Sequence, residues 1–112
     1  MNLSQSRIPV KIKNDKFKDR RGYFQEIYLK KKLNLKIKFT AIAYSKKKVI
    51  RGLHFQLKNK QSKLIYVSNG KILDVAVNLK KNSKNFGKIF KYVLKEGDIL
   101  FIPSFFAHGY EC

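Results

Sequence analysis

The feature that most limits the possible folds of this chain is a series of short apolar runs separated by turn-forming residues. The runs are rich in β-branched and aromatic residues, which is typical of strands. Alternation is clearest in 37–45 and 72–79, where one face of each segment is nearly all apolar. Only residues 30–35 favour a short helical turn. We expect strands over 10–13, 23–29, 37–45, 49–56, 63–67, 72–79, 88–94 and 99–102.

Two turn signals suggest how these strands are connected. Asn69-Gly70 lies between two apolar runs and predicts a two-residue β-hairpin, and Glu96-Gly97-Asp98 predicts a second turn before residue 99. No repeat or low-complexity linker divides the chain, so we expect a single domain over 1–112. Many short antiparallel strands without a long helix indicate an all-β jelly roll or a related double-sheet barrel.

A polar cluster interrupts one of the apolar runs. Arg51-Gly52-Leu53-His54-Phe55-Gln56 places one of only two histidines beside an arginine. Lys63 opens the next apolar run, and the second histidine, His108, lies near the end of the sequence. Barrels of this class carry their sites on inward positions, so we expect these side chains to share one pocket. Strict alternation places His54 and Gln56 on one face with Gly52, and Arg51, Leu53 and Phe55 on the other.

The formal charge of +19 raises the question of a nucleic-acid partner. Apart from Arg7, Arg20, Arg21 and Arg51, the basic residues are lysines scattered through nearly every segment. Base readout and phosphate recognition favour clustered arginine. We therefore expect a solvated surface and no nucleic-acid partner. The alternative, a basic nucleic-acid-binding barrel, predicts duplex binding that falls steeply with salt.

The cysteine content and the first residues bear on the cellular compartment. Cys112 is the only cysteine, so no internal disulfide is possible and a reducing compartment is expected. The polar start shows neither a signal peptide nor a membrane span. We expect a soluble, cytoplasmic protein with no membrane partner.

Several fragments, taken in order, resemble one known family. The chain is similar to dTDP-4-dehydrorhamnose 3,5-epimerases, whose fold is a cupin-like double-stranded β-helix (jelly roll). The first fragment, 17–26, resembles the family's F-x-D-x-R-G-x-F-x-E. The others are Ser45 with 49–56, then 61–64, Gly70 with Asp74-Val75, Ser83 with 86–88, and Ile102-Pro103 leading to Ala107-His108-Gly109.

The resemblance implies a nucleotide-sugar epimerase, an isomerase of dTDP-rhamnose and cell-surface polysaccharide biosynthesis. It would act on dTDP-4-dehydro-6-deoxyglucose, a dTDP-4-keto-6-deoxy sugar. Inversion at C3 and C5 requires a base with a pKa near neutrality and stabilisation of the enolate. By resemblance, His54 is the proton acceptor and Lys63 stabilises the enolate. No cofactor is required.

The resemblance also assigns binding roles. Arginine forks suit pyrophosphate oxygens, a carboxylate can accept sugar or base hydrogen bonds, and an aromatic ring can serve as an apolar wall. Family members are dimers that share strands, so a homodimer is expected. The residues that match the family's substrate contacts are Arg21, Phe24, Glu26, Arg51, Gln56 and His108.

A metal site is not expected, although many cupins hold one. Metal cupins usually offer two histidines two residues apart, whereas here the residue two after His54 is Gln56. With His54 and His108 as the only histidines, a histidine-rich metal centre cannot be assembled.

The sequence departs from the family pattern at several positions. Phe39 and Ala41 stand where the family usually has Gln and Asn, Asn78 where it has Asp, and Phe105 where it has Gly. Family members also continue past the His-Gly motif, with a tyrosine proton donor and a carboxylate that orients the catalytic histidine. We therefore expect a jelly roll that is incomplete at its C-terminus. The alternative function is an inactive or non-catalytic nucleotide-sugar-binding cupin.

Overall fold

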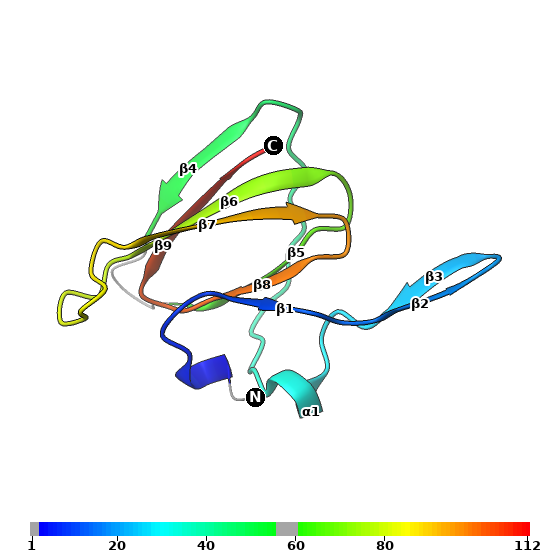
Figure 1. Cartoon of the computed structure of the whole chain (residues 1–112), viewed down its shortest axis with the longest axis horizontal. Helices are drawn as coiled ribbons and strands as arrows, with labels where there is room; N and C mark the ends of the chain where they lie inside the picture. The colour runs from blue at the N-terminus through cyan, green and yellow to red at the C-terminus, as the bar shows by residue number, and fades with distance from the viewer. Residues whose placement is uncertain (1–2, 56–60) are drawn as a thin grey trace.

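The computed structural model describes residues 3–55 and 61–112 and confirms the all-β prediction (Figure 1). Within these residues, helical structure is limited to two short pieces, a 3₁₀ turn and one turn of α-helix. The elements are η1 (Leu3–Gln5), β1 (Val10–Ile12), β2 (Lys16–Asp19), β3 (Gly22–Gln25), α1 (Lys30–Leu33), β4 (Ile50–His54), β5 (Lys63–Tyr66), β6 (Lys71–Asn78), β7 (Ile89–Lys95), β8 (Ile99–Ile102) and β9 (Phe106–Glu111).

Two antiparallel sheets form the body of the protein. One has the strand order β4-β9-β6-β7 and the other the order β1-β8-β5. We call the face of each sheet that looks toward the other sheet its inner face. The main core lies between the inner faces, where burial of apolar surface supplies the driving force for folding. Its buried members are Val67, Ala76, Leu94, Leu100, Ile102 and Phe106.

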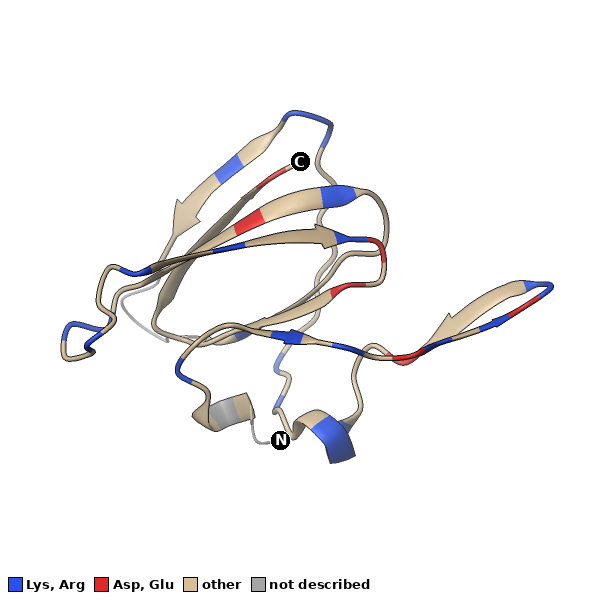
Figure 2. Cartoon of the chain, in the orientation of Figure 1, with Lys and Arg blue, Asp and Glu red and all other residues tan. Residues whose placement is uncertain are grey.

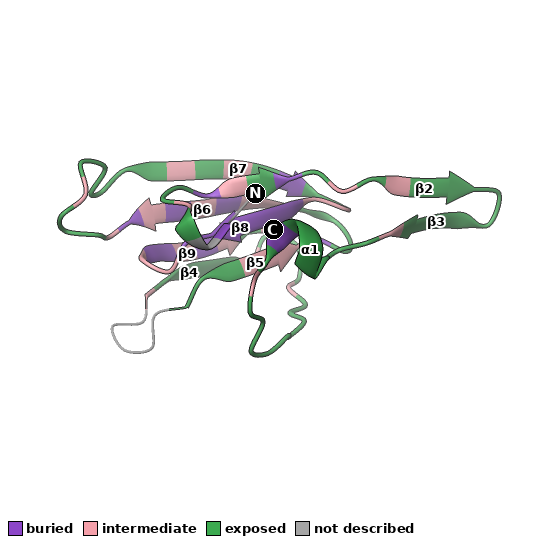
Figure 3. Cartoon of the chain, turned by 90° about the horizontal axis from the view of Figure 1, so that it is seen from below, coloured by how far each residue is buried: buried purple, intermediate pink, exposed green. Residues whose placement is uncertain are grey.

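A second core covers the outer face of the three-stranded sheet. Ile99 and Phe101 of β8 point away from the main core and pack with Leu3 of η1 and Leu33 of α1. Strand β8 is therefore buried on both faces, which explains why its sequence is continuously apolar rather than alternating. Burial is concentrated in β8, β6 and β9, whereas β4 and the β2–β3 hairpin are exposed (Figure 3).

The hairpin predicted at Asn69-Gly70 is wrong. Gly70 has the positive φ of a tight turn, 84°, but β5 and β6 belong to different sheets. The turn that contains Gly97 makes the reverse crossing, from β7 to β8. The two crossings bond to each other, with Gly97 N–H donating to Val67 O at 2.7 Å and Glu96 N–H to Gly70 O at 3.1 Å. Long-range pairing therefore determines the partners of β5 and β6.

The strand predicted over 37–45 is also absent. The segment leads from α1 to β4 as irregular coil (Figure 1) and forms no ladder with any strand that the structure describes. Its apolar side chains are consequently open to solvent, with Ile42 90% and Tyr44 84% exposed. Alternation of apolar and polar residues is typical of a strand, but a strand forms only where another strand is available for backbone hydrogen bonds.

The remaining predicted elements agree with the structure only in part. The helical turn predicted over 30–35 is confirmed as α1, which ends at Asn34 in the left-handed conformation with φ of 50°. The strand predicted over 23–29 stops at Gln25, and β2 and β9 were not predicted.

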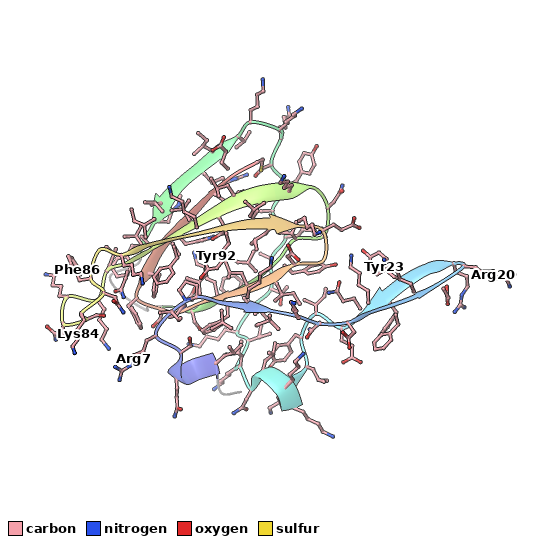
Figure 4. All side chains as sticks on the ribbon, viewed as in Figure 1. Arg7, Arg20, Tyr23, Lys84, Phe86 and Tyr92 are labelled. Carbon is pink, nitrogen blue, oxygen red and sulfur yellow. The ribbon has the colours of Figure 1, made fainter. Side chains whose placement is uncertain are left out.

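The β2–β3 hairpin, residues 16–25, extends from one end of the body, and we call it the arm (Figure 1). Arg20 lies at its tip, far along the long axis from the sheets, whereas Tyr23 lies nearer the body (Figure 4), where its hydroxyl donates to Glu96 Oε1 at 3.1 Å. Phe17 pairs directly with Phe24, and both rings are more than 60% exposed, at 62% and 64%. Such exposed apolar surface is typical of a contact region.

Lysine and arginine are spread over the arm, the loops and both sheets (Figure 2). This distribution agrees with a generally lysine-rich surface. Within the ranges that the structure describes, no helix is both long enough and apolar enough to cross a membrane.

Candidate active site

The inner face of the four-stranded sheet carries two adjacent rows of polar and aromatic side chains. The strand register places Tyr92, Asp74, Tyr110 and Arg51 side by side across β7, β6, β9 and β4. The next row consists of Phe90, Ala76, His108 and His54. Residues directly opposite each other on paired strands project to the same side. Both histidines therefore lie on one face.

A β-bulge in β4 corrects the predicted faces of Arg51 and His54. Arg51 pairs with Tyr110 and His54 with His108, so two residues of β4 oppose the single residue Gly109. The extra residue shifts the alternation by one, so Arg51 lies on the same face as His54 rather than on the opposite face.

The bulge requires glycine at 109. A Cβ atom there would lie 2.6 Å from the backbone oxygen of Arg51 and 3.0 Å from the carbonyl carbon and oxygen of Gly52. Only a residue without a side chain lets β9 approach the bulged backbone this closely.

Asp74 holds His108 in place. Its Oδ2 lies 2.6 Å from His108 Nε2, and the Asp74 side chain is fully buried. The other oxygen, Oδ1, has no hydrogen-bond partner among the described residues. Burial, and secondarily the charge of Asp74, raises the pKa of the neighbouring Tyr92. Asp74 was not among the site residues predicted from the sequence. The available signal was a charged carboxylate on the strand face that also carries the small apolar residue Ala76.

A second network orients Arg51. Its Nε–H donates to Ser45 Oγ at 2.9 Å, and its Nη2 donates to the backbone oxygen of Tyr44 at 3.4 Å. Ser45 Oγ in turn lies 3.1 Å from the hydroxyl of Tyr110. Neither Ser45 nor Tyr110 was predicted to belong to the site, because 65 residues separate them in sequence.

Lys63 lies on the opposite sheet. It is the first residue of β5 and pairs directly with Ile102, which belongs to the main core. Lys63 therefore projects from the inner face of the three-stranded sheet, toward the face that carries the histidines. Its side chain is exposed, as is that of His54. The exposure of His54 follows from its place on β4, an edge strand in which every residue is exposed.

Three predicted site residues lie elsewhere in the same chain. Arg21 and Phe24 are on the arm, and Glu26 follows it directly. Arg21 is 90% exposed and binds Asp19 through Nη2 at 2.6 Å and Nε at 3.2 Å, which lowers the pKa of that carboxyl. The arm is thus not part of the inner-face cluster of its own chain. Gln56 lies outside the described residues.

The cluster offers the chemistry of proton transfer and anion binding. Two imidazoles and a guanidinium lie on the inner face of one sheet and an ammonium group on the inner face of the other, and one imidazole is fixed by a buried carboxylate. Among residues 3–55 and 61–112, no group of three or more His, Cys, Asp or Glu side chains is placed to hold a metal ion.

Comparison with known proteins identifies close sequence relatives. The pattern of the family described as dTDP-4-dehydrorhamnose 3,5-epimerase matches residues 8–112. The curated dTDP-4-dehydrorhamnose 3,5-epimerase of Methanothermobacter thermautotrophicus is 38% identical over 88% of this chain. That of Shigella flexneri is 39% identical over 98%. The chain spans 57% of the length of the first and 67% of the second.

Solved structures of dTDP-4-dehydrorhamnose 3,5-epimerases also resemble this chain. The dTDP-4-dehydrorhamnose 3,5-epimerase of Sulfolobus tokodaii superposes with a TM-score of 0.86 at 37% identity, covering 96% of this chain and 65% of that one. An epimerase of Legionella pneumophila, solved in complex with dTDP-4-keto-L-rhamnose, superposes with a TM-score of 0.81 at 32% identity, covering 95% of this chain and 61% of that one.

Proposed function

Because the chain belongs to the dTDP-4-dehydrorhamnose 3,5-epimerase family, we propose that it inverts C3 and C5 of dTDP-4-dehydro-6-deoxyglucose. This would place it in the supply of dTDP-rhamnose for cell-surface polysaccharide, in the cytoplasm. The observation that carries the proposal is the pairing of His54 with His108 on the inner face, opposite the sheet that bears Lys63.

His54 acts as the general base. Protons at C3 and C5 are acidic because both carbons are α to the C4 ketone, and a neutral imidazole can accept them near pH 7. The electrons of the broken C–H bond move to the C4 oxygen and form an enolate. Inversion then requires that a proton return from the opposite face of the sugar.

Lys63 stabilises the enolate with its positive charge. Its ammonium group extends from the opposite sheet, so it can approach the C4 oxygen while His54 approaches the carbon. A cation placed where negative charge develops lowers the barrier more than it strengthens substrate binding. His108, held by Asp74 at 2.6 Å, lies beside His54 and presents its other ring nitrogen to the substrate.

Arg51 binds the diphosphate of the nucleotide. Its guanidinium lies on the same face as both histidines, because of the bulge. Bidentate hydrogen bonds from a guanidinium are well suited to phosphate oxygens. Gln56, two residues after His54, is proposed as a substrate contact by family resemblance alone.

The arm contributes Arg21, Phe24 and Glu26 to the site of a second copy of the chain. These residues match family substrate contacts but lie away from the inner-face cluster of their own chain (Figure 1). A homodimer in which each arm reaches the partner's site would reconcile the two facts. It would also cover the exposed rings of Phe17 and Phe24.

The epimerase proposal is tested with dTDP-4-keto-6-deoxyglucose in deuterated water. The chain should introduce deuterium at C3 and C5, measured by mass spectrometry and NMR. His54→Ala should slow the exchange by about 10²-fold to 10⁴-fold, the usual contribution of a general base. Lys63→Met should also slow it. Lys71→Met, which changes the lysine that begins β6 and lies on the outer face, is the matched control and should not slow the exchange.

Binding of dTDP without deuterium exchange would contradict the epimerase proposal and support the alternative, a non-catalytic nucleotide-sugar-binding cupin. Steeply salt-dependent duplex binding with no affinity for dTDP would favour the nucleic-acid-binding barrel instead.

The shared site is tested by mixing two inactive variants, His54→Ala and Arg21→Ala. If Arg21 serves the partner's site, each mixed dimer has one intact site and one site with both defects. Random mixing makes about half of the dimers mixed, so about one quarter of the unsubstituted activity should return. If Arg21 served its own chain's site, mixing would restore nothing.

A further inference from the structure

We infer that Tyr110 is a positioning residue that acts through Ser45 to aim the guanidinium of Arg51 at the diphosphate of the nucleotide sugar. This inference rests on the proposed function, because the diphosphate is the ligand that Arg51 is proposed to bind. It adds two residues, Tyr110 and Ser45, that hold Arg51 in place without themselves being assigned to the substrate.

The geometry supports a fixed orientation of Arg51. Tyr110 lies directly opposite Arg51 on the paired strands, and its hydroxyl lies 3.1 Å from Ser45 Oγ. Ser45 Oγ accepts the Nε–H of Arg51 at 2.9 Å, and the backbone oxygen of Tyr44 accepts from Nη2 at 3.4 Å. Both bonds engage the same edge of the guanidinium, the edge formed by Nε and Nη2.

The edge formed by Nη1 and Nη2 remains directed away from Ser45. A guanidinium donates from its edges in a rigid, planar fork, so fixing one edge fixes the direction of the other. That second edge is the one that can meet two phosphate oxygens at once. Tyr110 and Ser45 therefore decide where the bidentate contact forms.

The bond between Tyr110 and Ser45 holds the Ser45 hydroxyl at the position where it accepts the Nε–H of Arg51. Phenylalanine at 110 would keep the ring and its packing but would lose the bond to Ser45. The Ser45 hydroxyl would then no longer be fixed beside Arg51.

Pre-ordering is valuable at this position because Arg51 is exposed. A free arginine side chain must lose rotamer freedom when it binds a ligand, and that loss weakens binding. Hydrogen bonds that fix the side chain beforehand remove part of this cost. Tyr110 should consequently strengthen binding of the diphosphate without touching it.

The test measures dTDP affinity by titration calorimetry with the whole 112-residue chain. Tyr110→Phe should weaken dTDP binding about fivefold to tenfold, the effect of one hydrogen bond. In the Arg51→Lys background, where the fork is absent, the same substitution should change affinity less than twofold. Tyr66→Phe removes a hydroxyl from the outer face of the three-stranded sheet, away from both rows, and is the matched control, with affinity unchanged within twofold.

An equal loss from Tyr110→Phe in both backgrounds, or no loss in either, overturns the inference and leaves the proposed function standing. Absence of dTDP binding by the unsubstituted chain contradicts the proposed function instead. The positioning of Arg51 is then decided by NMR, from exchange of its Nε–H with water. Faster exchange in Tyr110→Phe but not in Tyr66→Phe supports the inference, and an unchanged rate in Tyr110→Phe overturns it.

Discussion

Gly109 should be the least replaceable residue of the strand pair that carries both histidines. A Cβ at this position would lie 2.6 Å from the backbone oxygen of Arg51 and 3.0 Å from two backbone atoms of Gly52. Every one of these neighbours is backbone, so no side chain can rotate away. The only relief is separation of β4 from β9 at the bulge.

The expected cost follows from that geometry. Overpacking against rigid neighbours costs about 1–3 kcal/mol. We expect Gly109→Ala to lower the free energy of unfolding by about 2 kcal/mol. The loss should not be larger, because β4 is an edge strand and can move outward. With a urea m-value of about 1.5 kcal/mol/M for a domain of this size, the unfolding midpoint should fall by about 1 M.

The chain provides a matched control on the other side of the same bulge. A Cβ at Gly52 would meet nothing within 4 Å, and the residue has no positive φ. Gly52→Ala should therefore leave the midpoint unchanged or raise it slightly, since alanine reduces the freedom of the unfolded chain. Urea unfolding followed by circular dichroism compares the two variants. Equal midpoints for Gly109→Ala and Gly52→Ala would refute the role assigned to the bulge.

Three further predictions concern other parts of the molecule. Asp74→Ala removes the partner of His108 Nε2 and should lower the free energy of unfolding by about 1–3 kcal/mol in urea titrations, whereas Asp74→Asn should cost less. The pKa of Asp19 is lowered by Arg21, so Arg21→Ala should raise it toward the ordinary carboxyl value in an NMR titration. Because that pKa is depressed in the folded arm, the Asp19–Arg21 contact is complete above the ordinary carboxyl pKa and is lost as the pH falls through the folded value. Leu100→Ala, at a fully buried position, should cost about 2–5 kcal/mol by thermal or urea unfolding, and a loss below 1 kcal/mol would contradict the assigned core.

Most strand positions could be read from the sequence because side-chain pattern is a local property. The runs that became β1 and β4 to β8 were found in this way, and the family resemblance was confirmed by comparison. The predictions that were wrong concerned which strands pair with one another. Residues 37–45 alternate as a strand does but pair with no strand among the described residues. Asn69-Gly70 forms a tight turn that links two sheets rather than two paired strands.

The candidate site could also be predicted from the sequence only in part. Alternation cannot reveal an extra residue, so it placed Arg51 and His54 on opposite faces until the register exposed the bulge at Gly109. The buried face of β6 is the one with Asp74 and Asn78, whereas the more apolar face is only partly buried. A polar residue on an inward face is recognisable as functional only when its partner is known, and His108 is 34 residues away.

We propose that the inner face of the four-stranded sheet binds the nucleotide sugar, and a crystal structure of the chain with dTDP would decide this. We expect the diphosphate within hydrogen-bond distance of the Arg51 guanidinium, on the same face as His54 and His108. A nucleotide bound on the outer face, or at any position that leaves Arg51 without a phosphate contact, would contradict it.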